Sequence, residues 1–320
     1  MEKMGIMKDK KEKKSIHSVI FTTFLIYLIF SYSQELYAKE LRIITSICSL
    51  GSIAREILGE SGEVISIGDG RFDLHKIEPR PSFLYHLSRA DYVIPVGMRL
   101  DTWFMSMIDS SGNSKIYPGS KGFIITYDRL EILEIPEYNI GQIRTGDIHP
   151  EGNPHYWLLP ENALKIAETI ANKLSEENPD KKDYFLQRYS DFRSEIEKLV
   201  SELRDMFKNF YGVKVVAYHN SWRYFEKFLG FEVIEFLEPA PGIPPTPSQV
   251  QKVINTIREN NVKVILYEPF QPISQIRFIS ERTQAKPVEI YQDCVPKIKD
   301  ISDYKNLLIY NTKKLIDGLK

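Results

Sequence analysis

Two hydrophobic patterns alternate along the chain. Short apolar runs rich in β-branched and aromatic residues predict strands at residues 41–48, 63–67, 90–96, 121–127, 213–218, 231–236, 262–267 and 286–291. Apolar residues spaced three or four apart predict helices at residues 52–58, 82–89, 160–174, 248–260 and 303–319. We expect Gly59 to end the first of these helices and Ser248 to cap the fourth. Strands that alternate with helices are typical of an α/β fold with mostly parallel sheets flanked by helices.

One segment differs from the rest in length. Residues 179–212 have no Gly or Pro between the two ends, and their apolar residues recur mostly at spacings of three or four. They predict one helix of roughly 30 residues, about 45 Å long. We therefore expect two α/β lobes, residues 39–178 and 213–320, joined by a long backbone helix that holds their relative positions.

The N-terminus is typical of an export signal. Five lysines between residues 8 and 14 precede an apolar run at residues 19–30, and Ala38 offers a cleavage site. The run is shorter than the roughly 20 residues of a membrane span. We expect a signal peptide at residues 1–38 and a periplasmic mature protein; an uncleaved N-terminal anchor is the alternative. No cysteine follows the run to serve as a lipid attachment site.

Charge and cysteine content narrow the function only slightly. The chain has 320 residues and a formal net charge of -1, which gives no indication of a nucleic-acid partner. Its two cysteines, Cys48 and Cys294, are compatible with a disulfide in an oxidising compartment or with two buried thiols. The sequence leaves both possibilities open.

The candidate chemistry lies in histidines near the ends of predicted strands. His75 follows the second strand, His219 ends the first strand of the second lobe, and Asp293 follows that lobe's last strand. His149 and His155 lie in a loop rich in Gly and Pro, directly before a helix. Ligands of open α/β sheets bind beyond the carboxyl ends of the strands. His75 and His155 from one lobe can therefore converge with His219 and Asp293 from the other.

Three imidazoles and one carboxylate form a ligand set that suits Zn²⁺, and Mn²⁺ is the alternative ion. Glu268, at another strand end, is the rival fourth ligand, or an acceptor that orients a histidine. His149 is expected to be a loop residue, with a role as a spare ligand as the alternative. Trp157 and Trp222 follow two of the ligands closely, and we expect them to pack under the site.

Four ordered segments resemble the zinc/manganese-binding periplasmic solute-binding proteins of bacterial ABC importers. They are residues 73–82 (DLHKIEPRPS), 152–158 (GNPHYWL), 218–225 (YHNSWRYF) and 238–243 (EPAPGI), and the resemblance extends over nearly all of residues 40–320. It implies two lobes bridged by a rigid helix, a metal ion in the cleft between them, and a membrane permease as partner. By motif match it places the metal ligands at His75, His155 and His219, with Asp293 as the fourth.

The chain departs from this family pattern at two positions. Leu74 stands where the family usually has Pro, and Leu159 stands where it has the Asp before the helix at Pro160. Neither is a ligand position, but the loss of the Asp removes a helix cap, worth about 1 kcal/mol. Residues 292–294 (QDC) match the family least well, so the fourth ligand rests on the weakest motif.

We therefore expect a monomeric extracytoplasmic receptor, not an enzyme, that captures Zn²⁺ and delivers it to an ABC permease. A zinc-dependent hydrolase with Glu268 as general base is one alternative. Against it, the chain has no His-Glu-x-x-His motif and no nucleophile motif. The other alternative is an adhesin whose metal only stabilises the fold, which should lose much of its stability when the metal is chelated.

Overall fold

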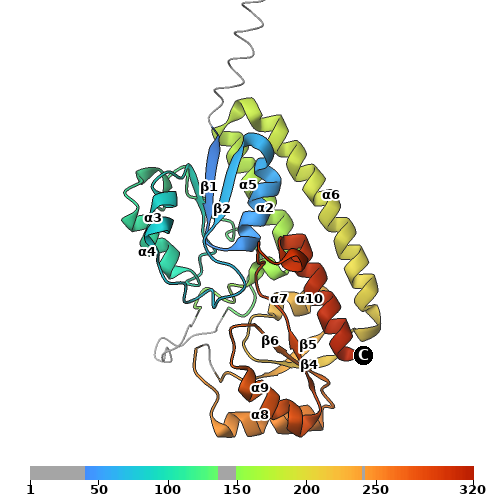
Figure 1. Ribbon diagram of the computed structural model, residues 1–320. Coiled ribbons are helices and arrows are strands. Elements are labelled where there is room, and N and C mark those ends of the chain that lie inside the picture. Colours follow the sequence, from blue (N-terminus) through green and yellow to red (C-terminus); the bar gives the residue numbers. More distant parts are fainter. Residues whose placement is uncertain (1–39, 136–148, 240–241) are drawn as a thin grey trace, which may run out of the picture. The chain divides into compact units, whose positions relative to one another are not determined.

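Two parallel sheets organise the chain in the computed structural model, which describes residues 40–135, 149–239 and 242–320. The first sheet has the strand order β2-β1-β3 and the second the order β5-β4-β6-β7 (Figure 1). The strands are β1 (Leu41–Thr45), β2 (Gly62–Ser66), β3 (Tyr92–Ile94), β4 (Lys214–Ala217), β5 (Glu232–Phe236), β6 (Val264–Tyr267) and β7 (Lys286–Glu289). The expected α/β fold with mostly parallel sheets is confirmed.

The helices follow the strands in the expected alternation. Those of the first half are α2 (Cys48–Leu58), α3 (Pro81–Leu87), α4 (Thr102–Ser110) and α5 (Pro160–Glu177). Those of the second half are α7 (Arg223–Leu229), α8 (Pro247–Glu259), α9 (Ile273–Thr283) and α10 (Tyr304–Leu319). The sequence patterns did not predict α4 or α9.

Alternation along the strands explains why both sheet faces are covered. On β1, Ile43 joins the core cluster that contains residues of α2 and α5, whereas its neighbour Ile44 joins the cluster formed with α3 and α4. On β6, Val264 joins the core shared with α10, and Ile265 faces α8 and α9. Successive side chains of a strand point to opposite faces, so each of these strands supports two helical layers.

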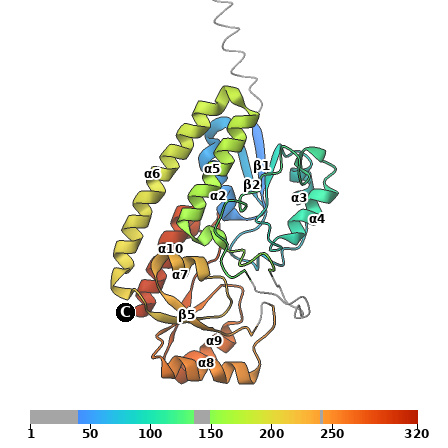
Figure 2. The same cartoon turned by 180° about the vertical axis from the view of Figure 1, so that it is seen from behind.

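The long helix α6 (Lys182–Phe207) runs beside both halves. It has 26 residues and is flanked by 3₁₀ turns at Pro179–Lys181 and Lys208–Phe210. It contacts α2 and α5 in the first half and α7 in the second, as the two opposite views show (Figures 1 and 2). The expected long helix is confirmed, although Leu41–Lys320 forms one compact unit and the lobe boundaries stay a prediction.

Three local predictions are wrong. Residues 121–127, all in the described part of the chain, form one parallel bridge from Phe123 to Val93 and no strand. Pairing with this segment stops after Val93, because the next residue of the chain that faces it, Pro95, has no backbone N–H to donate. The first strand ends at Thr45, since Cys48 already begins α2.

The start of α8 also differs from the prediction. The residue that caps this helix is Thr246, whose hydroxyl accepts the backbone N–H of Gln249, and not Ser248. At α5, by contrast, Leu159 occupies the N-cap position with no side-chain hydrogen bond, in line with the loss of the cap inferred from the sequence.

Cys48 and Cys294 form a disulfide, which resolves the choice that the sequence left open. The bond joins the N-terminal end of α2 to the segment that follows β7. The expected signal segment, residues 1–38, lies outside the described residues. Within the described residues, no helix is long and apolar enough to cross a membrane.

Candidate metal centre

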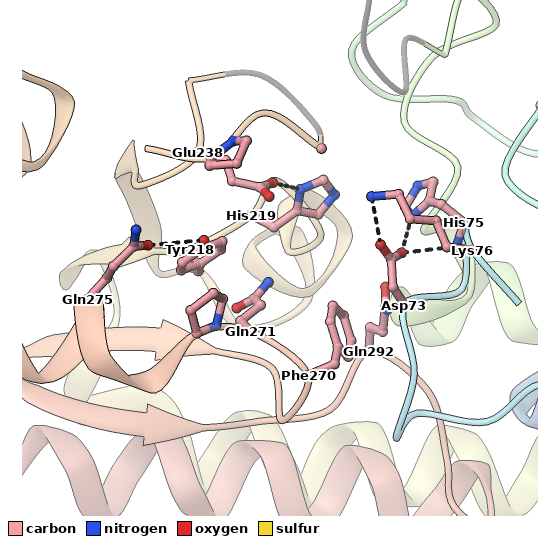
Figure 3. A pocket seen from close by; sticks show the side chains of 13 residues that line it. Asp73, His75, Lys76, Tyr218, His219, Glu238, Phe270, Gln271, Gln275 and Gln292 are labelled. Carbon is pink, nitrogen blue, oxygen red and sulfur yellow. Dashed lines mark hydrogen bonds and ion pairs between the residues drawn. The ribbon is translucent and has the colours of Figure 1, made fainter. Parts of the chain in front are cut away.

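Three histidines from distant parts of the chain meet at the carboxyl ends of the two sheets. His75 lies in the segment after β2, His155 precedes α5, and His219 follows β4 directly. One ligand atom from each ring lies within 4.8 Å of the others. The ring centroids are 5.7–5.9 Å apart. Figure 3 shows His75 and His219 on opposite sides of the pocket that they line.

Each of these rings is held through its Nδ1 atom by a side-chain oxygen. The Nδ1–oxygen distances are 2.9 Å from His75 to Asp73, 3.0 Å from His155 to Asn153 and 2.6 Å from His219 to Glu238. An acceptor on Nδ1 fixes the ring orientation and leaves Nε2 with the lone pair. The three Nε2 atoms are therefore the ones that can bind a cation.

In Asp73 and in Asn153, one side-chain oxygen accepts two hydrogen bonds from the histidine that follows. Oδ1 of Asp73 accepts both the backbone N–H and the ring Nδ1–H of His75, and Oδ1 of Asn153 does the same for His155. This is the Asx turn, in which a side chain bonds the backbone two residues ahead. Neither residue was predicted from the sequence to hold a histidine. The available signal was an Asp or Asn two positions before each histidine.

The electrostatic environment differs between the three rings. His155 is 1% exposed, and this burial lowers its pKa well below the ordinary value. Burial also opposes the charged form of His219, but the hydrogen bond and charge of Glu238 outweigh it and raise the pKa. Nε2 of His155 is buried with no hydrogen-bond partner among the described atoms. A buried neutral ring with an unsatisfied lone pair is ready to bind a metal ion.

Asp293 is fully buried and holds the start of α2. Its two carboxylate oxygens accept the backbone N–H groups of Cys48 at 2.9 Å and Ser49 at 2.7 Å. Burial raises its pKa to about 7 against the opposing effect of these bonds. Asp293 does not belong to the group of described ligand atoms that lie within 4.8 Å of one another.

Glu268 lies at the end of β6 and is also fully buried. Its Oε1 accepts the Ser221 hydroxyl at 2.7 Å, while Oε2 has no hydrogen-bond partner among the described atoms. Burial raises its pKa to about 7. The carboxylate that holds His219 is Glu238, whose Oε2 lies 2.6 Å from Nδ1 of the ring.

The two tryptophans lie where the sequence suggested. Trp157 and Trp222 are both 0% exposed, and the Trp157 ring lies 5.5 Å from that of His155. The indole N–H of Trp157 donates to the carbonyl of Gln292 at 2.7 Å. A pocket of about 260 Å³ opens beside His75 and His219, so the cluster is reached from one side and closed by aromatic packing near His155.

Comparison with known proteins identifies the class. The model of a family described as zinc-uptake complex component A, periplasmic, matches residues 43–318. This chain belongs to that family. The zinc-uptake component A match covers both sheets, the long helix and all three histidines.

Relatives and solved structures agree with this assignment. The manganese ABC transporter substrate-binding lipoprotein PsaA of Streptococcus mitis is 23% identical over 290 residues, which cover 88% of this chain and 90% of the relative. The metal ABC transporter substrate-binding lipoprotein ScbA of Streptococcus cristatus is 25% identical over 299 residues, which cover 90% of this chain and 91% of the relative.

Among solved structures, a crystal structure of ZnuA is 22% identical to this chain, with a TM-score of 0.73. The structure of a Mn-bound periplasmic metal-binding protein of Candidatus Liberibacter asiaticus is 18% identical, with a TM-score of 0.71. Each alignment covers 88% of this chain and 100% of the other. Together with the family match, they confirm the expected fold and class. The chain is a metal-binding, substrate-binding protein of an ABC transporter that works outside the cytoplasm.

Proposed function

We propose that this protein captures Zn²⁺ through the Nε2 atoms of His75, His155 and His219 and delivers the ion to the membrane permease of an ABC importer. The observation that carries the proposal is the convergence of the three rings, each with its Nδ1 held by an oxygen acceptor. Metal-bound histidines almost always have such an acceptor on the second ring nitrogen.

Zn²⁺ is favoured over Mn²⁺ by the type of ligand. Imidazole nitrogen suits zinc, whereas manganese prefers carboxylate, carbonyl and water oxygens. Three of the four proposed ligands are imidazoles, so the site is nitrogen-rich. Mn²⁺ stays the alternative, since several relatives are named as manganese transporters.

Asp293 is the proposed fourth ligand, by its match to the family motif. A carboxylate oxygen has two lone pairs, so Asp293 can keep a backbone hydrogen bond while it binds a metal ion. Glu268 is the rival, because its Oε2 is buried without a partner among the described atoms. The variants Asp293→Asn and Glu268→Gln separate the two, since only loss of the true ligand should weaken binding strongly.

We propose a receptor and not an enzyme. A zinc hydrolase needs a coordination position open to water, with a general base beside it. The candidate base, Glu268, is fully buried and accepts the Ser221 hydroxyl with one oxygen. Family membership supports a solute receptor as well. The monomeric state stays a prediction that size-exclusion chromatography with light scattering can test.

The test is competitive titration of the purified chain with Zn²⁺ and Mn²⁺, together with elemental analysis. We expect one tightly bound zinc, lost in His155→Ala and kept in the control His86→Ala, since His86 lies on α3 outside the cluster. Tighter binding of Mn²⁺ would change the cargo and keep the receptor. A wild-type chain that binds neither metal would refute the proposal.

Chelation separates the receptor from a protein that uses metal only for stability. A receptor must fold without its cargo in order to reload, so we expect a cooperative unfolding transition after treatment with EDTA. A structural metal protein would instead unfold when the metal is removed. Circular dichroism before and after chelation distinguishes the two.

A further inference from the structure

A carboxylate outside the histidine cluster connects the segments that carry two of its members. Oε2 of Glu134 accepts the side-chain amide of Asn153 at 3.0 Å and that of Asn220 at 2.8 Å. Asn153 lies two residues before His155, and Asn220 directly follows His219. One carboxylate oxygen therefore joins the segment before α5 to the segment after β4.

The side-chain amide of Asn153 uses its whole hydrogen-bonding capacity on these neighbours. Its Oδ1 accepts the backbone N–H and the ring Nδ1–H of His155, both at 3.0 Å. Its Nδ2 has two hydrogens, and it donates one to Glu134 and the other to the backbone carbonyl of Asn220 at 3.1 Å. The orientation of the His155 ring thus depends on an amide whose other end is fixed by Glu134 and Asn220.

The second oxygen of Glu134 is anchored to the other half of the chain. Oε1 accepts Nε of Arg223, at the start of α7, at 2.8 Å. The same guanidinium donates to both carboxylate oxygens of Glu226 at 3.1 Å and lies 5.1 Å from the ring of Phe236 on β5. Glu134 is therefore held by a cation that is itself fixed to the second sheet and its helix.

The backbone around Glu134 is held in an unusual conformation. Glu134 has a φ value of 55°, in the left-handed region that costs free energy at a residue with a side chain. The carbonyl of its neighbour Leu133 accepts the backbone N–H of Asn153 at 2.8 Å. The Tyr224 hydroxyl accepts the N–H of Leu133 at 2.9 Å and donates to the carbonyl of Asn153 at 3.0 Å. These contacts impose the conformation that places the Glu134 carboxylate beside Asn153.

The charge of Glu134 acts on His155 through the amide. Hydrogen bonds to a carboxylate are stronger than those between neutral groups, and hydrogen bonds in a chain polarise one another. Donation from Nδ2 of Asn153 to Glu134 therefore increases the negative charge on Oδ1, which strengthens its bond with the Nδ1–H of His155. An acceptor on Nδ1 orients the imidazole and makes it a more basic metal ligand.

We propose that Glu134 is a positioning residue of the metal site, which fixes the segments of His155 and His219 relative to each other and strengthens metal binding by His155 through Asn153. Glu134 does this without touching the ion. The inference rests on the proposed function and adds to it a residue from outside the ligand set.

The test compares Glu134→Ala and Glu134→Gln with Glu131→Ala as the matched control. Glu131 lies in the same segment and pairs with Lys227 on the same helix, α7, at 2.9 Å, so its loss also removes an ion pair between the two halves. Zn²⁺ affinity is measured by competitive titration. The visible absorption of bound Co²⁺ is measured as well, because it reports on the geometry of the ligands and not on the stability of the fold. Both measurements are repeated for Asn153→Ala and for its double variant with Glu134→Ala.

Glu134→Ala should weaken Zn²⁺ binding about tenfold, at the lower end of the effects known for groups that hold a ligand, and should shift the Co²⁺ bands. Glu134→Gln keeps one acceptor oxygen without the charge, so its loss should be smaller. Glu131→Ala should change Zn²⁺ affinity by less than about twofold and leave the Co²⁺ bands unchanged, since an exposed ion pair contributes little. In the Asn153→Ala background, Glu134→Ala should cost less than about twofold more, because both residues act through the same amide.

Two results would overturn the proposal. One is wild-type affinity and a wild-type Co²⁺ spectrum in both Glu134 variants. The other is a loss in the double variant that equals the sum of the two single losses in free energy, which would mean that Glu134 does not act through Asn153. A wild-type chain that binds no zinc would instead refute the proposed function, so the two failures are distinguishable.

Discussion

Removal of the disulfide should destabilise the metal-free protein strongly. Cys48 and Cys294 are separated by 246 positions, and a cross-link that closes so long a loop restricts the unfolded chain. The chain-entropy relation gives about 5.5 kcal/mol at 25 °C for this loop length. Both cysteines are buried, so the double variant Cys48→Ala and Cys294→Ala avoids placing a hydroxyl group in the core.

The assay is urea unfolding in the presence of EDTA, with oxidised wild type, reduced wild type and the double alanine variant compared. We expect reduction and substitution to lower the free energy of unfolding by similar amounts, with a larger denaturant slope, because an uncrosslinked unfolded chain exposes more surface. A loss below about 1 kcal/mol in both samples would refute the loop-closure reasoning. A loss in the variant alone would point to packing of the cysteine side chains instead.

Three further changes test the local structure. Thr246→Ala should cost about 1 kcal/mol in urea unfolding and Ser248→Ala much less, because only the former removes the α8 cap; equal losses would contradict the assignment. Asn153→Ala should weaken Zn²⁺ binding about 10–100-fold in competitive titration. Asn153→Asp keeps the acceptor oxygen, so its loss of Zn²⁺ affinity should stay below about 10-fold. Burial raises the pKa of Asp293 and Glu268 to about 7, so their protonated forms stabilise the metal-free fold at low pH and this stabilisation is lost as pH rises through 7. Zn²⁺ binds the deprotonated carboxylates, so the rise in unfolding temperature that Zn²⁺ causes should be larger at about pH 8 than at about pH 5.5. Calorimetry with Zn²⁺ and with EDTA measures this rise, and an equal rise at both pH values would contradict the prediction.

The location of the histidines could be predicted because it depends on local pattern. His75 and His219 follow the apolar runs that form β2 and β4, one in each sheet, and ligands of open α/β sheets bind beyond the carboxyl ends of the strands. The oxygen that holds His155 was also within reach of the sequence, since Asn153 is only two residues away. These features need no knowledge of how the chain folds over long distances.

Other features depend on contacts that the sequence does not display. The start of α2 is set by a carboxylate 245 positions away, because Asp293 accepts the N–H group of Cys48. Glu238 reaches His219 from the far side of β5, 19 positions along the chain. His149 and His75 are 74 positions apart in the chain, yet their Nε2 atoms lie 3.1 Å from each other. No spacing rule links such residues.

The segment after β7 limits how the two halves can move. Beside the disulfide, Trp157 donates to the Gln292 carbonyl, and Tyr304 donates to the Trp157 carbonyl and to the hydroxyl oxygen of Ser52. These bonds and the packing of α10 on α2 and α6 attach the end of the second half to the first.

A wide opening between the sheets would break these buried hydrogen bonds and pull against a covalent link. Each such hydrogen bond contributes only about 0.5–1.5 kcal/mol, but the disulfide does not yield at all outside reducing conditions. Cargo release therefore has to come from local movement of ligands. Of the three proposed ligands, the one most open to such movement is His219, whose side chain is 14% exposed and whose acceptor Glu238 lies in a proline-rich loop. The buried His155, at the other extreme, is the proposed ligand that should leave the metal last.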